Sequence, residues 1–301
     1  MAAPKFLRRP LAFRDRFRPW VIRRTVRNTY EGIPRRHRKL CFFASYSATS
    51  ELSPYLLAYL GELHRCGLDI VFCTTSEQLD AEQISELTEY CHYVIHRTNT
   101  GHDFASWKAC FALFPQWRAA EALLITNDSV LGPLQPLGGI FARIDGSAGP
   151  CWGLNDSHER AYHLQSFFLY FKAEALAAGR FRRFWQGVSL LTEKYDIVKF
   201  YEVGLTRQLQ RAGLVCQALF PSAEVQDYCR SLGSRYQYPD VLGSAKFNAS
   251  LYAAYEMVEG MEYPFIKSDL IRNDRYNSRH IDALRERLRS FAENDAPALR
   301  D

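Results

Sequence analysis

Long apolar runs are missing from this sequence of 301 residues. The longest apolar pieces, YLLAYL at 55–60 and FFLYF at 167–171, fall well short of the roughly 18 apolar residues that span a bilayer. The first 30 residues are basic and contain no apolar core of the length found in a secretory signal. We therefore expect the chain to remain in the cytoplasm.

Motifs that mark two other kinds of protein are missing as well. The eight cysteines include no Cys-x-x-Cys pair, and several stand inside apolar runs, as Cys41 and Cys73 do. This usage is typical of small buried side chains in a reducing compartment, and it argues against a zinc site. No Gly-x-Ser-x-Gly motif is present, so the nucleophile signature of many hydrolases is lacking.

Negative charge is scarce at the start of the chain. Residues 1–39 hold 13 lysines and arginines against only Asp15 and Glu31. The whole chain has a net charge of +5, so the remainder is mildly acidic. A mildly acidic body gives no indication of nucleic-acid binding. We predict a separate basic arm over residues 1–37.

This arm places aromatic residues among its arginines, for example Phe13, Phe17 and Trp20. Arginine heads can lie among lipid phosphates while aromatic rings enter the acyl boundary. The arm is therefore predicted to lie on an anionic membrane surface. A solvated basic leader and a docking site for an acidic partner are the alternatives.

From residue 38 onward, apolar strands alternate with amphipathic helices. This alternation predicts βαβ units and a mostly parallel sheet flanked by helices, which is the α/β class. Ligands of such sheets bind beyond the carboxyl ends of the strands. The expected strands lie at 39–46, 68–75, 92–97 and 121–129, and the expected helices at 54–66, 80–91 and 103–114.

The later part of the chain is less regular. It contains a predicted helix over 201–213 that ends at a glycine, a common C-terminal cap. The last segment, 276–301, is predicted to form an amphipathic helix that docks on the body. The apolar face of this helix consists of Ile281, Leu284, Leu288 and Phe291.

Three motifs in this order resemble those of nucleotide-sugar glycosyltransferases of the GT-A fold. Asn99-x-Gly101 follows the third strand, and ITNDS at 125–129 stands where that family has Asp-x-Asp. The helix over 201–213 puts Glu202 at the position of the general base. The sequence between about residues 38 and 272 more closely resembles the rhamnan-synthesis F family. The motifs that carry this resemblance are, in order, HDFASWKA, NDSVLGPL, WG, HLQSFF, FW, YEVGLT and EYPFIK.

The resemblance implies a single catalytic domain of the GT-A-like, Rossmann-like type. It would transfer a sugar, rhamnose by the family's name, from a nucleotide sugar to a growing cell-surface polysaccharide or lipopolysaccharide. Residues 38–150 would bind the nucleotide sugar, and residues 151–275 would bind the acceptor and carry the catalytic group. Glu202 would take the acceptor proton in an inverting displacement. At a helix start, it would be held ionised by backbone N–H groups.

The expected donor site gathers polar residues at the strand ends. Asp103 can accept hydrogen bonds from a nucleoside or cap its own helix. Gly101 can let the backbone approach the ligand or form a simple turn, and Lys108 can reach a phosphate or point to solvent. The predicted donor-binding residues are Ser45, Thr74, Asn99, Gly101, Asp103, Lys108, Asn127, Asp128 and Ser129.

Asp128 is also the candidate ligand for a divalent cation, Mg²⁺ or Mn²⁺. Such ions favour carboxylate, amide carbonyl and water oxygens, and one would bridge the two donor phosphates. The NDS sequence at 127–129 has one carboxylate where Asp-x-Asp has two. Three alternatives therefore remain for this sequence. They are a weaker metal site, a cationic side chain in place of the ion, and an Asx turn that closes the strand.

Further polar and aromatic residues are candidates for the acceptor side. Trp152 offers a face to a sugar ring, and polar groups nearby can bond sugar hydroxyls. Lys267 and Arg272 can neutralise diphosphate charge or form surface salt bridges. The predicted sugar pocket consists of Trp152, His163, Gln165 and Ser166.

The implied partners are dTDP-rhamnose, a lipid-linked glycan acceptor, and the inner membrane face through residues 1–37. A transferase of the same fold that uses another hexose is one alternative. A non-catalytic assembly scaffold that keeps the fold is another. Catalysis requires Asp103, Asp128 and Glu202 to meet around one cleft.

Overall fold

The computed structural model describes residues 19–48, 52–273 and 278–295. The first half of the predicted basic arm, residues 1–18, therefore lies outside the described residues. Within the described part of the chain, no helix is both long and apolar enough to cross a bilayer.

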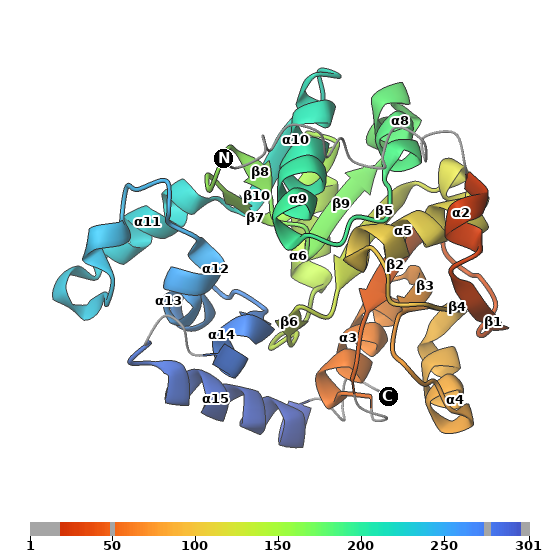
Figure 1. Ribbon diagram of the computed structural model, residues 1–301. Coiled ribbons are helices and arrows are strands. Elements are labelled where there is room, and N and C mark those ends of the chain that lie inside the picture. Colours follow the sequence, from red (N-terminus) through yellow and green to blue (C-terminus); the bar gives the residue numbers. More distant parts are fainter. Residues whose placement is uncertain (1–18, 49–51, 274–277, 296–301) are drawn as a thin grey trace, which may run out of the picture.

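Nine strands of the described residues form one central sheet, in the order β1-β4-β3-β2-β5-β9-β7-β10, with β8 paired to β7 (Figure 1). β2, β3, β4, β5, β7 and β10 point in one direction, and β1, β8 and β9 run antiparallel to their neighbours. The predicted α/β class with a mostly parallel sheet is confirmed. The strands are β1 (Val26–Glu31), β2 (Lys39–Ser45), β3 (Leu68–Thr74), β4 (Cys91–Arg97), β5 (Ala122–Asn127), β7 (Cys151–Ser157), β8 (His163–Leu164), β9 (Phe168–Lys172) and β10 (Cys216–Phe220).

Helices cover both faces of the sheet, because alternate residues of a buried strand point to opposite faces. In β2, Cys41 and Phe43 pack with α3, α4 and α6. Leu40 and Phe42 pack with α5, α8 and α10 on the other face. The helices are α2 (Pro19–Arg23), α3 (Pro54–Arg65), α4 (Ala81–Tyr90), α5 (His102–Leu113), α6 (Gly138–Gly146), α7 (Ala173–Ala177), α8 (Gly179–Gly187), α9 (Lys194–Ile197), α10 (Val203–Gln210), α11 (Ser222–Ser231), α12 (Ala249–Tyr252), α13 (Ala254–Gly260), α14 (Ser268–Asn273) and α15 (Ile281–Ser290).

The strand order reverses at β2. From β2 the chain adds β3 and β4 on one side, and it then returns to place β5 on the other side. Such a reversal opens a crevice outside the carboxyl ends of the two central strands, because the connections leave toward opposite faces. Ser45 ends β2 and Asn127 ends β5, so both residues lie at this crevice.

The predicted arm of residues 1–37 includes a segment that belongs to the sheet. Residues 26–31 form β1, which pairs antiparallel with β4 at the sheet edge. Val26 and Tyr30 pack against the two cores, whereas the residues between them are exposed. The sequence VRNTYE does not predict this strand, because only two of its six side chains are apolar.

A second, two-stranded sheet follows the end of β5 and leads into the segment 267–269, which lines the crevice. β6 (Val130–Leu131) pairs antiparallel with β11 (Ile266–Lys267). Ser268 then donates to Ser129 O through both its N and its Oγ, each over 3.0 Å. A segment near the end of the chain is thus fixed beside the end of β5.

α15 lies in the segment predicted as an amphipathic helix. Its residues Leu284 and Leu288 are buried with Ala58 of α3 and Leu270 of α14. The described cysteines are all free thiols, and all but Cys66 are buried, as their apolar surroundings predict.

The turn from β4 into α5 generates a prediction about Gly101. Its φ is +76°, and an added Cβ would lie 2.8 Å from Ala105 Cβ and 3.0 Å from Leu190 Cα. Gly213 has nearly the same φ, +79°, with nothing within 4 Å of an added Cβ. Gly213→Ala should therefore cost about 1–2 kcal/mol for the left-handed backbone alone. Gly101→Ala should cost about 1–3 kcal/mol more because of overpacking.

Urea unfolding of the two variants measures this difference. Equal losses of unfolding free energy would show that the contact with Leu190 gives way freely and does not fix the start of α5.

Candidate active site

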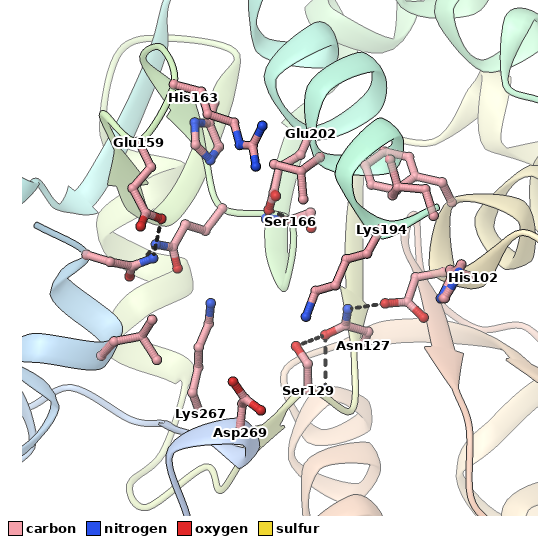
Figure 2. Close-up of a pocket in the computed structure, with 18 of the residues that line it drawn as sticks. His102, Asn127, Ser129, Glu159, His163, Ser166, Lys194, Glu202, Lys267 and Asp269 are labelled. Carbon is pink, nitrogen blue, oxygen red and sulfur yellow. Dashed lines mark hydrogen bonds between the residues drawn. The ribbon is translucent and has the colours of Figure 1, made fainter. Parts of the chain in front are cut away.

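A cleft of about 940 Å³ lies beyond the carboxyl ends of β5 and β7 (Figure 2). Its walls come from α5, the helix that carries Glu202, the turn between β8 and β9, and the segment 267–269. This volume falls within the roughly 300–1,000 Å³ of typical small-molecule sites. The predicted residues found in its wall are Asp103, Asn127, Ser129, His163, Gln165, Ser166, Glu202 and Lys267.

The carboxylate of Glu202 is held by Ser166. Ser166 N and Oγ donate to Glu202 Oε1 over 2.8 and 2.9 Å. Figure 2 shows both side chains on the same side of the cleft. Two donors on one oxygen fix the orientation of the carboxylate, because each removes a rotational choice.

The prediction that Glu202 begins a helix is wrong. α9 begins at Lys194, and a π-helical turn, η2 (Val198–Glu202), joins it to α10. Glu202 is therefore held by Ser166 and not by the N–H groups of a helix start. π turns inside α-helices are frequent at functional sites, because the extra residue changes which side chains face a site.

Asn127 links Asp103 to Ser129 at the end of β5. Its Nδ2 donates to Asp103 Oδ2 over 2.8 Å, and its Oδ1 accepts from Ser129 N and Oγ over 3.2 and 2.6 Å (Figure 2). The bond from Ser129 N forms the Asx turn that was one alternative for NDS. Burial raises the pKa of Asp103; the bond from Asn127 opposes this rise, and the nearby charge of Glu202 adds to it.

Asp128 lies in a smaller adjoining pocket of about 80 Å³, together with Ser45 and Thr74. Ser45 Oγ and Tyr46 N donate to Asp128 Oδ2 over 2.7 and 2.9 Å. Burial raises the pKa of Asp128 to about 6, and the charge of Asp103 contributes to this rise. The expected meeting of Asp103, Asp128 and Glu202 around one cleft is therefore found only in part, because Asp103 and Glu202 line the large cleft and Asp128 lines the adjoining pocket. The charge of Asp103 nevertheless acts on both of the other carboxylates.

Two lysines reach into the cleft from different elements. Figure 2 shows the side chain of Lys194 between Glu202 and Asn127, and that of Lys267 pointing into the cleft from beside Asp269. Lys267 Nζ lies 5.5 Å from the ring centre of Phe167. Burial lowers the pKa of Lys267, and the charge of Glu202 opposes this decrease.

Amide side chains form the wall opposite α5. Gln165 Nε2 donates to Asn248 Oδ1 over 2.8 Å, and Asn248 Nδ2 donates to Glu159 Oε2 over 3.0 Å. Ser250 Oγ donates to Gln165 Oε1 over 3.0 Å. His163 Nδ1 lies 2.8 Å from Ala161 O. Such a fixed row of polar groups suits the hydroxyls of a sugar.

Two predicted site residues lie away from both pockets. Lys108 donates to Gln186 O over 3.3 Å and to Val188 O, so it holds the end of α8 and lines a separate cavity. Trp152 is buried at the start of β7, where its Nε1 donates to Gly149 O over 2.9 Å. The prediction that these residues contact the donor or the sugar is therefore wrong.

Three other predictions are modified by the structure. Asn99 is exposed and lines neither pocket. Gly101 permits close packing against Leu190, so its conformation serves the fold and not the approach of a ligand. Arg272 lines the smaller pocket, beside Asp128.

Several residues of the cleft were not predicted. Glu159 follows the carboxyl end of β7, where ligands of such sheets bind, so its position could have predicted it. Asp269 comes two residues after Lys267, which was itself predicted, so that neighbour could have pointed to it. Lys194 and Asn248 stand in segments of irregular pattern, and nothing in the sequence marks them.

The two aspartates show how far the chain fits a divalent cation. Among the described residues, no three His, Cys, Asp or Glu side chains are grouped to hold a metal ion. Asp103 and Asp128 nevertheless repel one another. Mg²⁺ usually binds through one or two carboxylates, completed by water and substrate phosphates. The pair fits a cation that arrives with the donor.

The sequence profile of one protein family covers every residue that lines the larger cleft and eight of the 18 that line the smaller pocket. The profile of rhamnan synthesis protein F matches residues 70–269, well over half of the chain. The chain belongs to the rhamnan synthesis protein F family. The match includes Asp103, Asn127, Glu202 and Lys267, and it confirms the family that the motifs resemble.

Two relatives of this family member match over shorter stretches. Protein y4gN of Sinorhizobium fredii is 26% identical over 175 residues, which is 56% of this chain and 45% of the relative. The virulence protein VirA of Vibrio anguillarum is 25% identical over 205 residues, which is 63% of this chain and 66% of the relative. The aligned part spans less than two thirds of either relative.

One solved structure with a similar arrangement is the apo form of the glycosyltransferase GlyE of Streptococcus pneumoniae. It is 11% identical, with 88% of this chain and 62% of GlyE covered, and the TM-score is 0.43. A likeness at this TM-score carries no argument about function.

The raised pKa of Asp128 generates a prediction about stability. Its native pKa of about 6 exceeds the ordinary 3.8, so the ionised carboxylate disfavours folding above pH 6, and this cost disappears as the pH falls toward 4. Asp128→Asn should therefore stabilise the protein at pH 8 by about 1–2 kcal/mol, and the gain should shrink toward pH 5.

Thermal melting between pH 5 and pH 8 measures this gain. The exposed Asp240 supplies the matched control, Asp240→Asn, which removes a carboxylate from the protein surface. A pH-independent effect of Asp128→Asn would contradict the assignment.

Proposed function

We propose that this chain is a glycosyltransferase that moves a sugar from a nucleotide sugar to a glycan acceptor. The observation that carries this proposal is the carboxylate of Glu202, fixed by Ser166 in a cleft that also contains Asp103 and two lysines. An oriented carboxylate beside positive charge supplies both needs of the reaction, a proton acceptor and a partner for the leaving diphosphate.

The reaction proceeds as a single displacement. Glu202 Oε2 takes the proton of the acceptor hydroxyl, since the hydrogen bonds from Ser166 occupy Oε1. The acceptor oxygen forms a bond to the anomeric carbon while the bond to the diphosphate oxygen breaks and leaves its electron pair there. Attack opposite the leaving group inverts the configuration, through an oxocarbenium-like transition state.

The nucleotide occupies the small pocket and the region of Asp103. Ser45, Thr74 and Asp128 offer hydrogen-bonding groups at the strand ends, where ligands of such sheets bind. Lys194 and Lys267 offset the charge that develops on the diphosphate. The sugar lies between these lysines and Glu202, against the amide groups of Gln165 and Asn248.

Asp128, with Asp103 as a second carboxylate, would hold a divalent cation brought by the donor. When bound, the ion offsets phosphate charge and polarises the phosphate oxygens. Binding of Mg²⁺ or Mn²⁺ would relieve the repulsion between the two aspartates.

Rhamnose, donated as dTDP-rhamnose, is the proposed sugar because the family takes its name from rhamnan synthesis. The proposed acceptor is a lipid-linked glycan of a surface polysaccharide or lipopolysaccharide, reached at the inner membrane face. The basic residues of 1–37 favour that location by attraction to anionic lipid.

The role of Glu202 gives a direct test. Glu202→Gln keeps the side-chain size and removes the base, so release of nucleoside diphosphate should fall by about 10²–10⁴-fold while donor affinity changes little. The exposed Glu224 on α11 supplies the matched control, Glu224→Gln, which should retain full activity. Parental activity in Glu202→Gln would refute the base assignment.

Donor binding gives a second test, which separates a transferase from a scaffold. A nucleotide sugar at about 100 times its dissociation constant should stabilise the native state by about 2.7 kcal/mol. Thermal shifts across a panel of nucleotide sugars would identify the donor, and dTDP-rhamnose should give the largest shift. An added shift with Mn²⁺ should vanish in Asp128→Asn. A protein that binds no nucleotide sugar would be a scaffold, and another preferred donor would identify a different hexose.

A further inference from the structure

A second cavity, of about 540 Å³, lies between α5, α8 and α2, which Figure 1 shows grouped on one side of the molecule. Its apolar wall consists of Phe111, Trp117 and Trp185. It lies on a different part of α5 from the active-site cleft, which takes Asp103 from the first turn of that helix. We name it the α5–α8 cavity.

Two donors in this wall lack acceptors. Trp117 and Trp185 are each only 3% exposed. Neither indole Nε1 has a hydrogen-bond partner among the described residues. Leaving a buried donor unsatisfied costs about 1–3 kcal/mol.

Four of the seven other lining residues are cationic. Arg23, Arg118 and Arg182 line the cavity together with Lys108, and no acidic residue of the described chain does so. No ion pair is formed by the three arginines within the described ranges. The guanidinium of Arg118 lies 5.2 Å from the ring centre of Trp117. The cavity therefore combines an apolar aromatic wall with three arginines, of which Arg23 and Arg182 donate to the backbone oxygens of Ala112 and Ala177.

We propose that the α5–α8 cavity binds an anionic membrane phospholipid. An acyl chain packs against the three aromatic rings, and the arginines bind the phosphate. These two kinds of group stand at opposite ends of such a lipid. Tryptophan and arginine are suited to this boundary, since each joins an apolar surface to a polar contact.

The chain's own N-terminal segment is a poor occupant of this site. Residues 1–18 contain six lysines and arginines against one acidic residue, Asp15, so their charge repels the arginines of the cavity. Both sets of cations are complementary to the same anionic surface. α2, which directly follows this segment in the sequence, carries Arg23 into the cavity.

Vesicles with the full chain test this proposal. Vesicles of equal parts phosphatidylcholine and phosphatidylglycerol should bind the protein, and phosphatidylcholine alone should not. Phosphatidylglycerol brominated on the acyl chain should quench tryptophan fluorescence, because bromine quenches only an indole that it approaches closely. Trp117→Phe should retain binding and lose part of the quenching. Arg118→Gln and Arg182→Gln should each weaken binding about fivefold.

The exposed Arg211 on the far end of α10 gives the matched control, Arg211→Gln, which should bind as the parent does. A chain lacking residues 1–18 should bind more weakly but keep its quenching. Binding without quenching by the brominated chain would overturn the proposal, because surface charge alone would then explain the attraction. Loss of all binding on removal of residues 1–18, with no effect of the cavity variants, would overturn it too.

Discussion

The side chain of Asn127 fixes the centre of the active-site cleft, because one amide offers donor and acceptor in fixed opposite positions. Its Nδ2 holds Asp103 at the start of α5, and its Oδ1 holds Ser129 at the start of the turn toward β6. Ser129 O then accepts from Ser268, which sets the wall that carries Lys267. An aspartate at position 127 would lose the bond to Asp103 and would add a negative charge beside those of Asp103 and Asp128. This explains why the NDS sequence has an amide at its first position.

The arrangement of strands and helices follows from the sequence because buried parallel strands and their caps have strong local patterns. Ligands of parallel sheets bind beyond the carboxyl ends of the strands, and this rule correctly selects Ser45, Asn127 and Asp128 as pocket residues. The prediction that Lys108 reaches the donor fails for a geometric reason. Five residues separate it from Asp103, which is a rotation of about 140° around an α-helix, so the two side chains leave on different faces.

Other positions depend on contacts between distant segments, and local patterns are silent about these. Trp152 stands at the amino end of β7, the edge of the sheet opposite to the cleft. Lys194 enters the cleft from the first residue of α9, and Asn248 is held there by a bond from Gln165. β1 has only two apolar side chains, yet pairing with β4 suffices to order it, since the edge of a sheet needs few buried contacts.

The short ladder between β6 and β11 has a consequence for how the protein is made. The sheet, Asp103 and Glu202 are complete once the ribosome has added residue 220, the end of β10. Lys267 and Ser268 come later, and the wall that they form pairs with residues laid down more than a hundred positions before. A nascent chain therefore completes the central sheet before the wall that carries Lys267 and Ser268 can enclose the cleft.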